Sequence, residues 1–279
     1  MPAIGPSSAL IIEHGRADRH YWQDLWRYRE LFQVLAWRDI SVRYKQTVIG
    51  AAWAIIRPVL TMVVFTVVFG KLARLPSDGG APYSLMVFAA MLPWSFFSTA
   101  VSDAANSVVG NANLISKVYF PRLIVPTSAV VVALIDFLIG LAILAALMIW
   151  FQVSPGWSIL LLPAFMVIAA AASLGAGLWV ASLNVKYRDF RHITPFVIQL
   201  GLYISPVGFS SSLVPEQWRL LYSLNPMVGV IDGFRWSLLG SDRPLDLQGL
   251  AVGTLVAFLI LWRGITRFRA TEKRFADLV

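Results

Sequence analysis

Two ionisable residues inside apolar segments are the first candidates for chemistry in this sequence. Arg57 interrupts the apolar run 48–69, and Asp136 lies in the middle of the run 123–151. A charged side chain in hydrocarbon is costly, so it must reach the membrane surface, find a partner or face water. Arg57 either extends to the headgroups or faces a polar passage, where it would contact an anionic lipid-linked substrate. Asp136 is too deep to extend, so we expect it to be paired, protonated or hydrated, and a pair with Arg57 stays open.

The sequence lacks the motifs of nucleotide hydrolysis and of metal binding. It has no G-x-x-x-x-G-K-S/T loop, no cysteine, and only three histidines, His14, His20 and His192, which lie outside the apolar runs without metal-ligand spacing. We therefore expect a chain that hydrolyses no ATP, holds no cofactor or metal of its own, and draws the energy for any transport from another protein.

The elements that must position these residues are long apolar runs. The chain is 58% apolar and 14% charged, with a mean hydropathy of +0.69, whereas soluble domains carry roughly a quarter charged residues. A membrane span needs roughly 20 predominantly apolar residues. The sequence predicts an all-α integral membrane fold with six transmembrane helices, at 48–69, 83–101, 123–151, 159–183, 193–209 and 247–262.

The net charge of +8 does not indicate nucleic-acid binding, because the basic residues gather beside the apolar runs. They lie mainly before the first run, after the last, and in alternate loops, which is the pattern of cytoplasmic segments. The flanking basic residues are Arg16, Arg19, Arg27, Arg29, Arg38, Arg43, Lys45, Arg263, Arg267, Arg269, Lys273 and Arg274. We predict a multi-pass protein of the inner (plasma) membrane with both termini in the cytoplasm and no cleavable signal peptide.

Shorter elements surround these spans. From Tyr21 to Tyr44, apolar residues recur every three or four positions, which predicts an amphipathic helix on the cytoplasmic surface, in contact with membrane lipids. Pro215 and Asn225-Pro226 break the region after the fifth run into two short helices, near 215–223 and 227–239, dipping into the outer face. The domain division is then 1–47 for the cytoplasmic lead and interface helix, 48–270 for the membrane domain, and 271–279 for the tail.

Two further patterns concern packing and passage. The segment 169–182 carries small residues at four-residue spacing, which favours close helix packing within or between subunits. Aromatic residues such as Trp53, Tyr203 and Phe209 either form interfacial belts and core, or line a passage in which sugar rings stack on them. The cytoplasmic loops 106–122 and 184–192 are short, polar and aromatic, and together they favour a docking surface for a partner.

Four segments carry a resemblance to a known family. They are LWRYRELFQVLAWRDISVRYKQTVIGAAWAIIRP (Leu25 to Pro58), LPWSFFSTAVSDAANSVVGNANLISKVYFPR (Leu92 to Arg122), SLNPM (Ser223 to Met227) and EKRFADLV (Glu272 to Val279). In order and over essentially the whole chain, they resemble the permease subunit of type-2 ABC exporters of polysaccharides, which include O-antigen, capsule and teichoic-acid exporters.

The resemblance implies a homodimer of six-span subunits that docks on two copies of a separate ATPase, which binds ATP and magnesium, and that moves a lipid-linked polysaccharide outward. It implies an interface helix at Tyr21 to Tyr44, a coupling helix at Asn111 to Phe120, and gating helices at Pro215 to Leu239. The residues that this implies for ATPase coupling are Arg27, Arg38, Asp39, Asn113, Lys117, Tyr119 and Arg188. For the substrate channel the resemblance supports Trp53, Tyr203 and Phe209, and Arg57 is added as a candidate because of its position inside an apolar run.

Two rival functions follow from the same residues. A proton-driven secondary transporter would use Asp136 as its relay carboxylate, but such folds show internal repeats, and no convincing repeat is found here. A membrane-embedded enzyme of glycan assembly would need acidic or histidine groups converging at one membrane face, and none converges. Among cargoes, O-antigen comes first, with capsular polysaccharide or teichoic acid as the alternative.

Overall fold

The computed structural model describes residues 21–45, 48–77, 80–187, 189–240, 245–272 and 275, and within these ranges the regular elements are all helical. The α-helices are α1 (Tyr21–Arg27), α2 (Arg29–Lys45), α3 (Val48–Phe65), α4 (Tyr83–Gly110), α5 (Ala112–Lys117), α6 (Ile124–Trp150), α7 (Leu162–Lys186), α8 (Phe190–Ile204), α9 (Glu216–Tyr222), α10 (Pro226–Leu239) and α11 (Leu247–Glu272). Short helical segments η2 (Thr66–Leu72), η4 (Trp157–Leu161) and η5 (Ser211–Leu213) extend or connect them.

Within the described residues, four helical segments are long and apolar enough to cross a membrane: Tyr83–Gly110, Ile124–Trp150, Trp157–Lys186 and Leu247–Glu272. They coincide with the second, third, fourth and sixth predicted spans, although α4 and α11 run further toward the α5 end than the hydropathy alone indicated. The polar final turns of these two helices continue the helical hydrogen bonding past the apolar stretch. Multi-pass insertion is thus supported by length and composition.

The first and fifth predicted spans are helical but do not meet the same criterion in the described residues. The run 48–69 becomes α3 followed by the π-helical η2, and Pro58 lies inside α3. The run 193–209 becomes α8, which ends at Ile204. Pro206 explains that end, because a proline disfavours the helical conformation of the residue before it and cannot donate a backbone hydrogen bond.

The core of the bundle is α4, which packs against α6, α7 and α10, while α7 packs along α11. The small residues predicted to mediate packing lie at these contacts. A Cβ atom on Gly264 of α11 would meet the Gly175 carbonyl of α7, and one on Gly177 would lie 2.6 Å from the Ala104 Cβ of α4. Only a glycine fits at such separations. The row of small residues on α7 therefore packs against helices of the same subunit.

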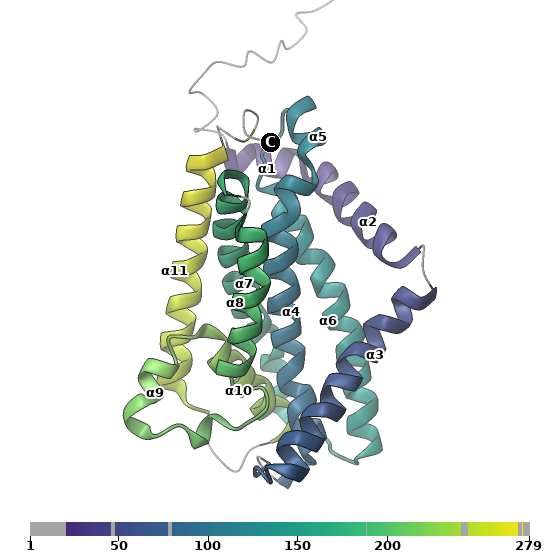
Figure 1. Cartoon of the computed structure of the whole chain (residues 1–279), viewed down its shortest axis with the longest axis vertical. Coiled ribbons are helices and arrows are strands. Elements are labelled where there is room, and N and C mark those ends of the chain that lie inside the picture. Colours follow the sequence, from purple (N-terminus) through teal and green to yellow (C-terminus); the bar gives the residue numbers. More distant parts are fainter. Residues whose placement is uncertain are drawn as a thin grey trace, which may run out of the picture.

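The predicted loops segregate to opposite ends of the bundle (Figure 1). At one end lie α1, α5, the final turns of α11 and the connection from α7 to α8. At the other end lie α9 and α10, together with the start of α4. Among the described residues, the helix α1 and the final turns of α11, which both carry flanking basic residues, therefore share one end, as the charge pattern predicted.

Candidate functional site

The basic end of the bundle is organised by α1 and α2. Their apolar stripe, which includes Tyr21, Leu25, Phe32 and Leu35, packs on a cluster formed by the ends of α4, α5, α6, α7 and α11. The sequence predicted this stripe but assigned it to the membrane surface. The structure shows that it faces protein instead, because the helix ends beneath it supply apolar partners such as Ile115, Phe120 and Phe268.

With the stripe buried against protein, the opposite side of α1 and α2 is left open. Trp22, Trp26 and Trp37 are 60%, 73% and 71% exposed, and Arg27 is exposed beside them. The element is also two helices rather than one, since Tyr28 forms a turn between α1 and α2. An exposed aromatic and basic surface of this kind is available to a membrane or to another protein.

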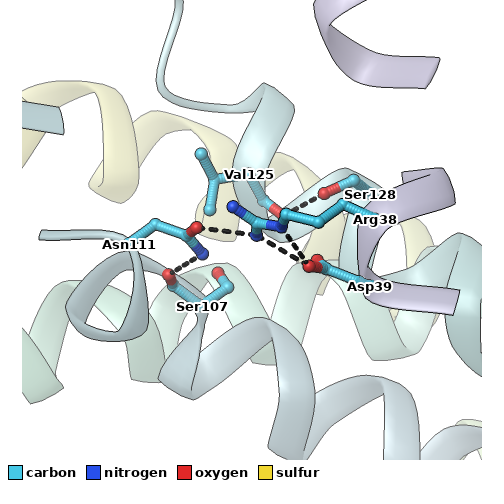
Figure 2. Close-up of polar contacts among 6 residues, drawn as sticks. All are labelled: Arg38, Asp39, Ser107, Asn111, Val125 and Ser128. Atoms are coloured by element: carbon cyan, nitrogen blue, oxygen red, sulfur yellow. Dashed lines mark hydrogen bonds and ion pairs between the residues drawn. The ribbon is translucent and has the colours of Figure 1, made fainter. Parts of the chain in front are cut away.

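Arg38 ties α2 to the point where α4 ends and α5 begins (Figure 2). Its Nη2 donates to Asn111 Oδ1 at 2.8 Å, and its Nε and Nη2 donate to Asp39 Oδ1 at 2.8 and 2.7 Å. Asn111 is held in turn, because its Nδ2 donates to the Ser107 carbonyl at 2.9 Å. Asn111 is both the last cap of α4 and the first cap of α5, so a displacement of α2 acts directly on that junction.

A second contact between α2 and the bundle lies one turn further along. Arg43 Nη2 lies 3.3 Å from Asp103 Oδ2 of α4, and Arg43 Nη1 lies 3.0 Å from Asp136 Oδ2 of α6. Tyr44 donates its hydroxyl to Asp136 Oδ1. Burial of the phenol, followed by its hydrogen bond to Asp136 and that residue's charge, raises the pKa of Tyr44, so the phenol stays protonated and remains a donor.

The partner of Asp136 is therefore Arg43, and the expectation that this carboxylate is paired is confirmed. The alternative pair with Arg57 falls outside the described residues, because the Arg57 side chain is not among them. Together, Arg43, Asp103 and Asp136 form a charge cluster at the edge of a polar cleft that also includes Asp39 and Asn106. We call it the Arg43 cluster.

The start of α1 and the end of α11 meet on the opposite side of the same end. The Arg122 backbone N–H donates to Glu272 Oε1 at 2.8 Å, and the Tyr21 hydroxyl donates to the same oxygen at 3.3 Å. The Arg269 guanidinium lies 4.5 Å from the centre of the Tyr21 ring. Glu272 thus joins α1, the α5–α6 connection and α11, which fixes the loop that follows α5.

Helix α5 and the residues directly after it present a polar face. Asn113, Lys117 and Tyr119 are exposed, while Ile115 and Phe120 are buried below. Burial and the nearby Asp24 of α1 raise the pKa of Tyr119. Of the residues predicted for coupling, the structure thus joins Arg38 and Asp39 in one network and places Asn113, Lys117 and Tyr119 on the neighbouring open surface. Arg188 lies outside the described residues.

The residues predicted to line a channel are not brought together within the described part of this subunit. Tyr203 lies on α8 and is 59% exposed. Phe209 is half-buried in the connection after α8, where its carbonyl accepts a hydrogen bond from Arg235 Nη1 at 2.8 Å. The side chains of Trp53 and Arg57 lie outside the described residues, although the backbone of both belongs to α3.

Four residues of this end were not singled out from the sequence: Arg43, Asp103, Asn111 and Glu272. Arg43 was counted only as a flanking positive charge. Asp103 could have been predicted to have a partner, because a carboxylate near the end of an apolar run needs one, as was expected for Asp136. Asn111 and Glu272 gave no such signal, since a polar residue at a helix end is ordinary.

Comparison with known proteins agrees with this architecture. The family model described as ABC-2 type transporter matches residues 30–239. That range begins in α2 and ends with α10, so it contains the α2 contacts, α5 and the helices of the opposite end.

Several curated proteins are similar over most of their length. An O-antigen export system permease protein RfbA of Myxococcus xanthus is 28% identical over 261 residues, which are 92% of this chain and 98% of the relative. A protein of the same name from Klebsiella pneumoniae is 25% identical over 90% of this chain and 95% of its own. The inner membrane transport permease YadH of Escherichia coli K12 is 29% identical over 77% and 88%.

Proposed function

Because this chain belongs to the ABC-2 type transporter family, we propose that it is the permease subunit of a polysaccharide exporter and that its cargo is O-antigen. It is a multi-pass inner-membrane transport component, and its family implies an ATP-binding-cassette partner. The observation that carries the cargo is the match to O-antigen export permeases over 90% or more of this chain. Capsular polysaccharide or teichoic acid is the alternative cargo for the same architecture.

The partner ATPase, in this proposal, docks on the open surface formed by α5 and the exposed side of α1 and α2. Asn113 and Lys117 offer donors on α5, Tyr119 offers a ring just after it, and Arg27 adds a charge on α1. These side chains are exposed, whereas the apolar residues below them are buried in one cluster. A polar surface that lies on packed residues suits such a docking site, because a movement of the bound partner then displaces the helices beneath it.

Force then passes from α2 into the bundle through two contacts. Arg38 reaches the α4–α5 junction, and the Arg43 cluster joins α2 to α4 and α6. Because α4 is the central helix of the core, a rotation of α2 that displaces α4 also changes how α4 packs against α6, α7 and α10. ATP and magnesium are bound by the partner, and we expect no cofactor in this chain.

The exporter is, in this proposal, a homodimer with the passage between two copies. Helices α3 and α8 expose many large apolar side chains, among them Ile56, Leu60, Val64, Phe196 and Leu200. Lipid covers some of this area, and a second subunit would cover the rest. We propose that α3 and α8 cross the membrane in the dimer, which completes six spans, and that both termini face the cytoplasm. Trp53, Arg57, Tyr203 and Phe209 stay candidate lining residues, each on or beside these helices.

A proton-driven mechanism is less well supported. A relay carboxylate has to exchange protons with water on alternate sides, whereas Asp136 is engaged by the Arg43 guanidinium and by the Tyr44 hydroxyl. Asp136 is better explained as part of a structural link than as a proton carrier.

The test is transport by the purified proteins. The chain is reconstituted with its ATPase partner into vesicles that contain a lipid-linked O-antigen, and glycan reaching the opposite face is measured with ATP, without ATP and with a proton gradient alone. We expect transport with ATP only. Transport driven by a proton gradient without the ATPase would exclude the proposal.

A second experiment tests the docking surface. Deletion of residues 112–117 removes α5 and should abolish both association with the ATPase and transport, while insertion into the membrane persists. Normal ATPase association after the deletion would place the docking site elsewhere.

A further inference from the structure

The end of the bundle opposite α5 contains a polar pocket that the transport scheme above does not use. It lies between the connection after α8, helices α9 and α10, and the start of α11. Its walls carry hydroxyl, carboxylate and aromatic groups, chiefly Ser211, Tyr222, Asp232, Trp236 and Asp246. A concave site with a few convergent polar groups and aromatic surface is the usual form of a small-molecule site.

The frame of this pocket is fixed by a buried arginine. Arg235 of α10 is 4% exposed and donates to three backbone carbonyls: Val207 at 2.9 Å, Phe209 at 2.8 Å and Met86 at 3.3 Å. These bonds join α10 to α4 and to the connection after α8. The wall that carries Ser211 is therefore held at a set position relative to α10, which lowers the entropy cost of binding.

Further hydrogen bonds hold the other walls. The Tyr222 hydroxyl donates to the Ile204 carbonyl at 2.8 Å, and Asp246 Oδ1 accepts from the Gly249 backbone at 3.0 Å. Burial, followed by the charge of Asp232, raises the pKa of Tyr222, so its phenol stays protonated. The remaining lone pairs of these oxygens can accept hydrogen bonds from a ligand.

The charges of the pocket select the chemistry of its ligand. Among the lining residues that the structure describes, Arg219 and Arg235 are matched by Asp232 and Asp246, so the formal charges of these four residues cancel. The N–H groups of Arg235 already donate to backbone carbonyls, so the pocket offers an anionic ligand few donors. A neutral ligand with many hydroxyl groups fits best, because hydroxyls donate to carboxylates and the C–H face of a sugar ring packs on an indole such as that of Trp236.

We propose that this pocket binds a sugar residue of the exported glycan on the outer side of the membrane. The inference rests on the proposed export function and on cytoplasmic termini, which place α9 and α10 outside. A glycan held there after crossing cannot slide back while the ATPase resets. Each subunit would then carry its own outer sugar subsite, separate from any passage between subunits.

The natural absence of cysteine allows a direct test. Ser211→Cys places a thiol in the pocket, and Leu213→Cys places one on the same short helical turn but outside the pocket, at a position that is 50% exposed. Each variant is produced with its ATPase in cells that make the glycan, and labelling by a membrane-impermeant maleimide is measured with glycan synthesis on and off.

We expect both positions to be labelled when no glycan is made. During export, Ser211→Cys labelling should fall by about threefold, the value for a site two-thirds occupied, while Leu213→Cys labelling is unchanged. Equal labelling of Ser211→Cys in both states, equal protection of both positions, or no labelling of Ser211→Cys from outside would each overturn the proposal.

Surface glycan, measured in the same cells, separates this inference from the proposed function. If glycan reaches the surface through the variants without protection at Ser211→Cys, export stands and the subsite is wrong. If surface glycan forms equally well in cells lacking this chain, the export function itself is wrong. Trp236→Ala, with Trp218→Ala as an exposed α9 control outside the pocket, should reduce surface glycan selectively.

Discussion

Removal of the positive charge of Arg43 is the sharpest test of how α2 is joined to the bundle. Arg43→Met keeps most of the side chain's length but leaves Asp103 and Asp136 without the cation that both contact. Breaking a buried ion pair costs about 3–5 kcal/mol, whereas exposed pairs contribute about 0–1 kcal/mol. The three side chains are 34%, 36% and 30% exposed, so a loss of about 2 kcal/mol, between those limits, is expected.

The assay is thermal unfolding of the purified chain in detergent, with variants compared at one scan rate. A loss of that size should lower the Tm by about 4–8 °C in a chain of this length. Arg38→Met is the matched control, because Arg38 is 45% exposed and its pair with Asp39 is of the weak surface kind. Its Tm should fall by less than about 3 °C.

Charge removal on the other side of the pair completes the test. Arg43→Met combined with Asp103→Asn and Asp136→Asn should recover most of the lost Tm, since neutral amides need no cation. Transport should stay impaired in the triple variant, because α2 is still not held by charge to α4 and α6. A Tm for Arg43→Met equal to that of the unchanged chain, or no recovery in the triple variant, would refute the role of the cluster.

Three further predictions follow from other contacts. Gly264→Leu should prevent α7 and α11 from packing and so abolish accumulation of folded chain, seen as loss of a monodisperse peak in size-exclusion chromatography, whereas Gly110→Ala, where the space is open, should not. Asn111→Ala should leave ATPase association intact in a pull-down but reduce ATP-driven transport several-fold, because Arg38 loses its contact across the junction; unchanged transport would remove Arg38 from the pathway. Arg235→Met should remove the three hydrogen bonds that join α10 to α4 and to the connection after α8, and lower the Tm by more than Arg38→Met does; equal shifts would contradict that role.

Hydropathy and the positions of the prolines predicted the helices well, because both signals depend on residues that are close in sequence. Pro215 and Asn225-Pro226 gave the short helices α9 and α10 to within a few residues, since a proline fixes where a helix can begin. Asn225 confirms the mechanism, because its side chain accepts from the Met227 backbone at the start of α10. The six-span count went further than the four long apolar helices found among the described residues, since length in residues does not fix how a helix such as α3, with Pro58 inside it, crosses a bilayer.

Side-chain partnerships could not be predicted in the same way, because they depend on how helices far apart in sequence are placed. Asp136 could be expected to have a partner, yet the sequence pointed to Arg57 as the candidate and not to Arg43. The choice depends on α2 lying against α6, and α2 lies there because its apolar stripe finds protein beneath it. A periodic pattern gives the direction of that stripe but not whether lipid or protein covers it.

The basic residues from which the topology was predicted also illustrate why position matters more than sign. All flanking arginines count alike in the positive-inside rule, since that rule acts during insertion and concerns charge near a span. After folding, Arg38 and Arg43 make specific contacts with three helices, whereas Arg27 stays exposed. Replacement of Arg43 by lysine would keep the topology yet lose the two-sided bridge, because a single ammonium cannot reproduce the guanidinium's fork between two carboxylates. Transport by an Arg43→Lys variant should therefore fall while its membrane orientation, read from cysteine accessibility at Leu213→Cys, stays the same; full transport would show that charge alone suffices.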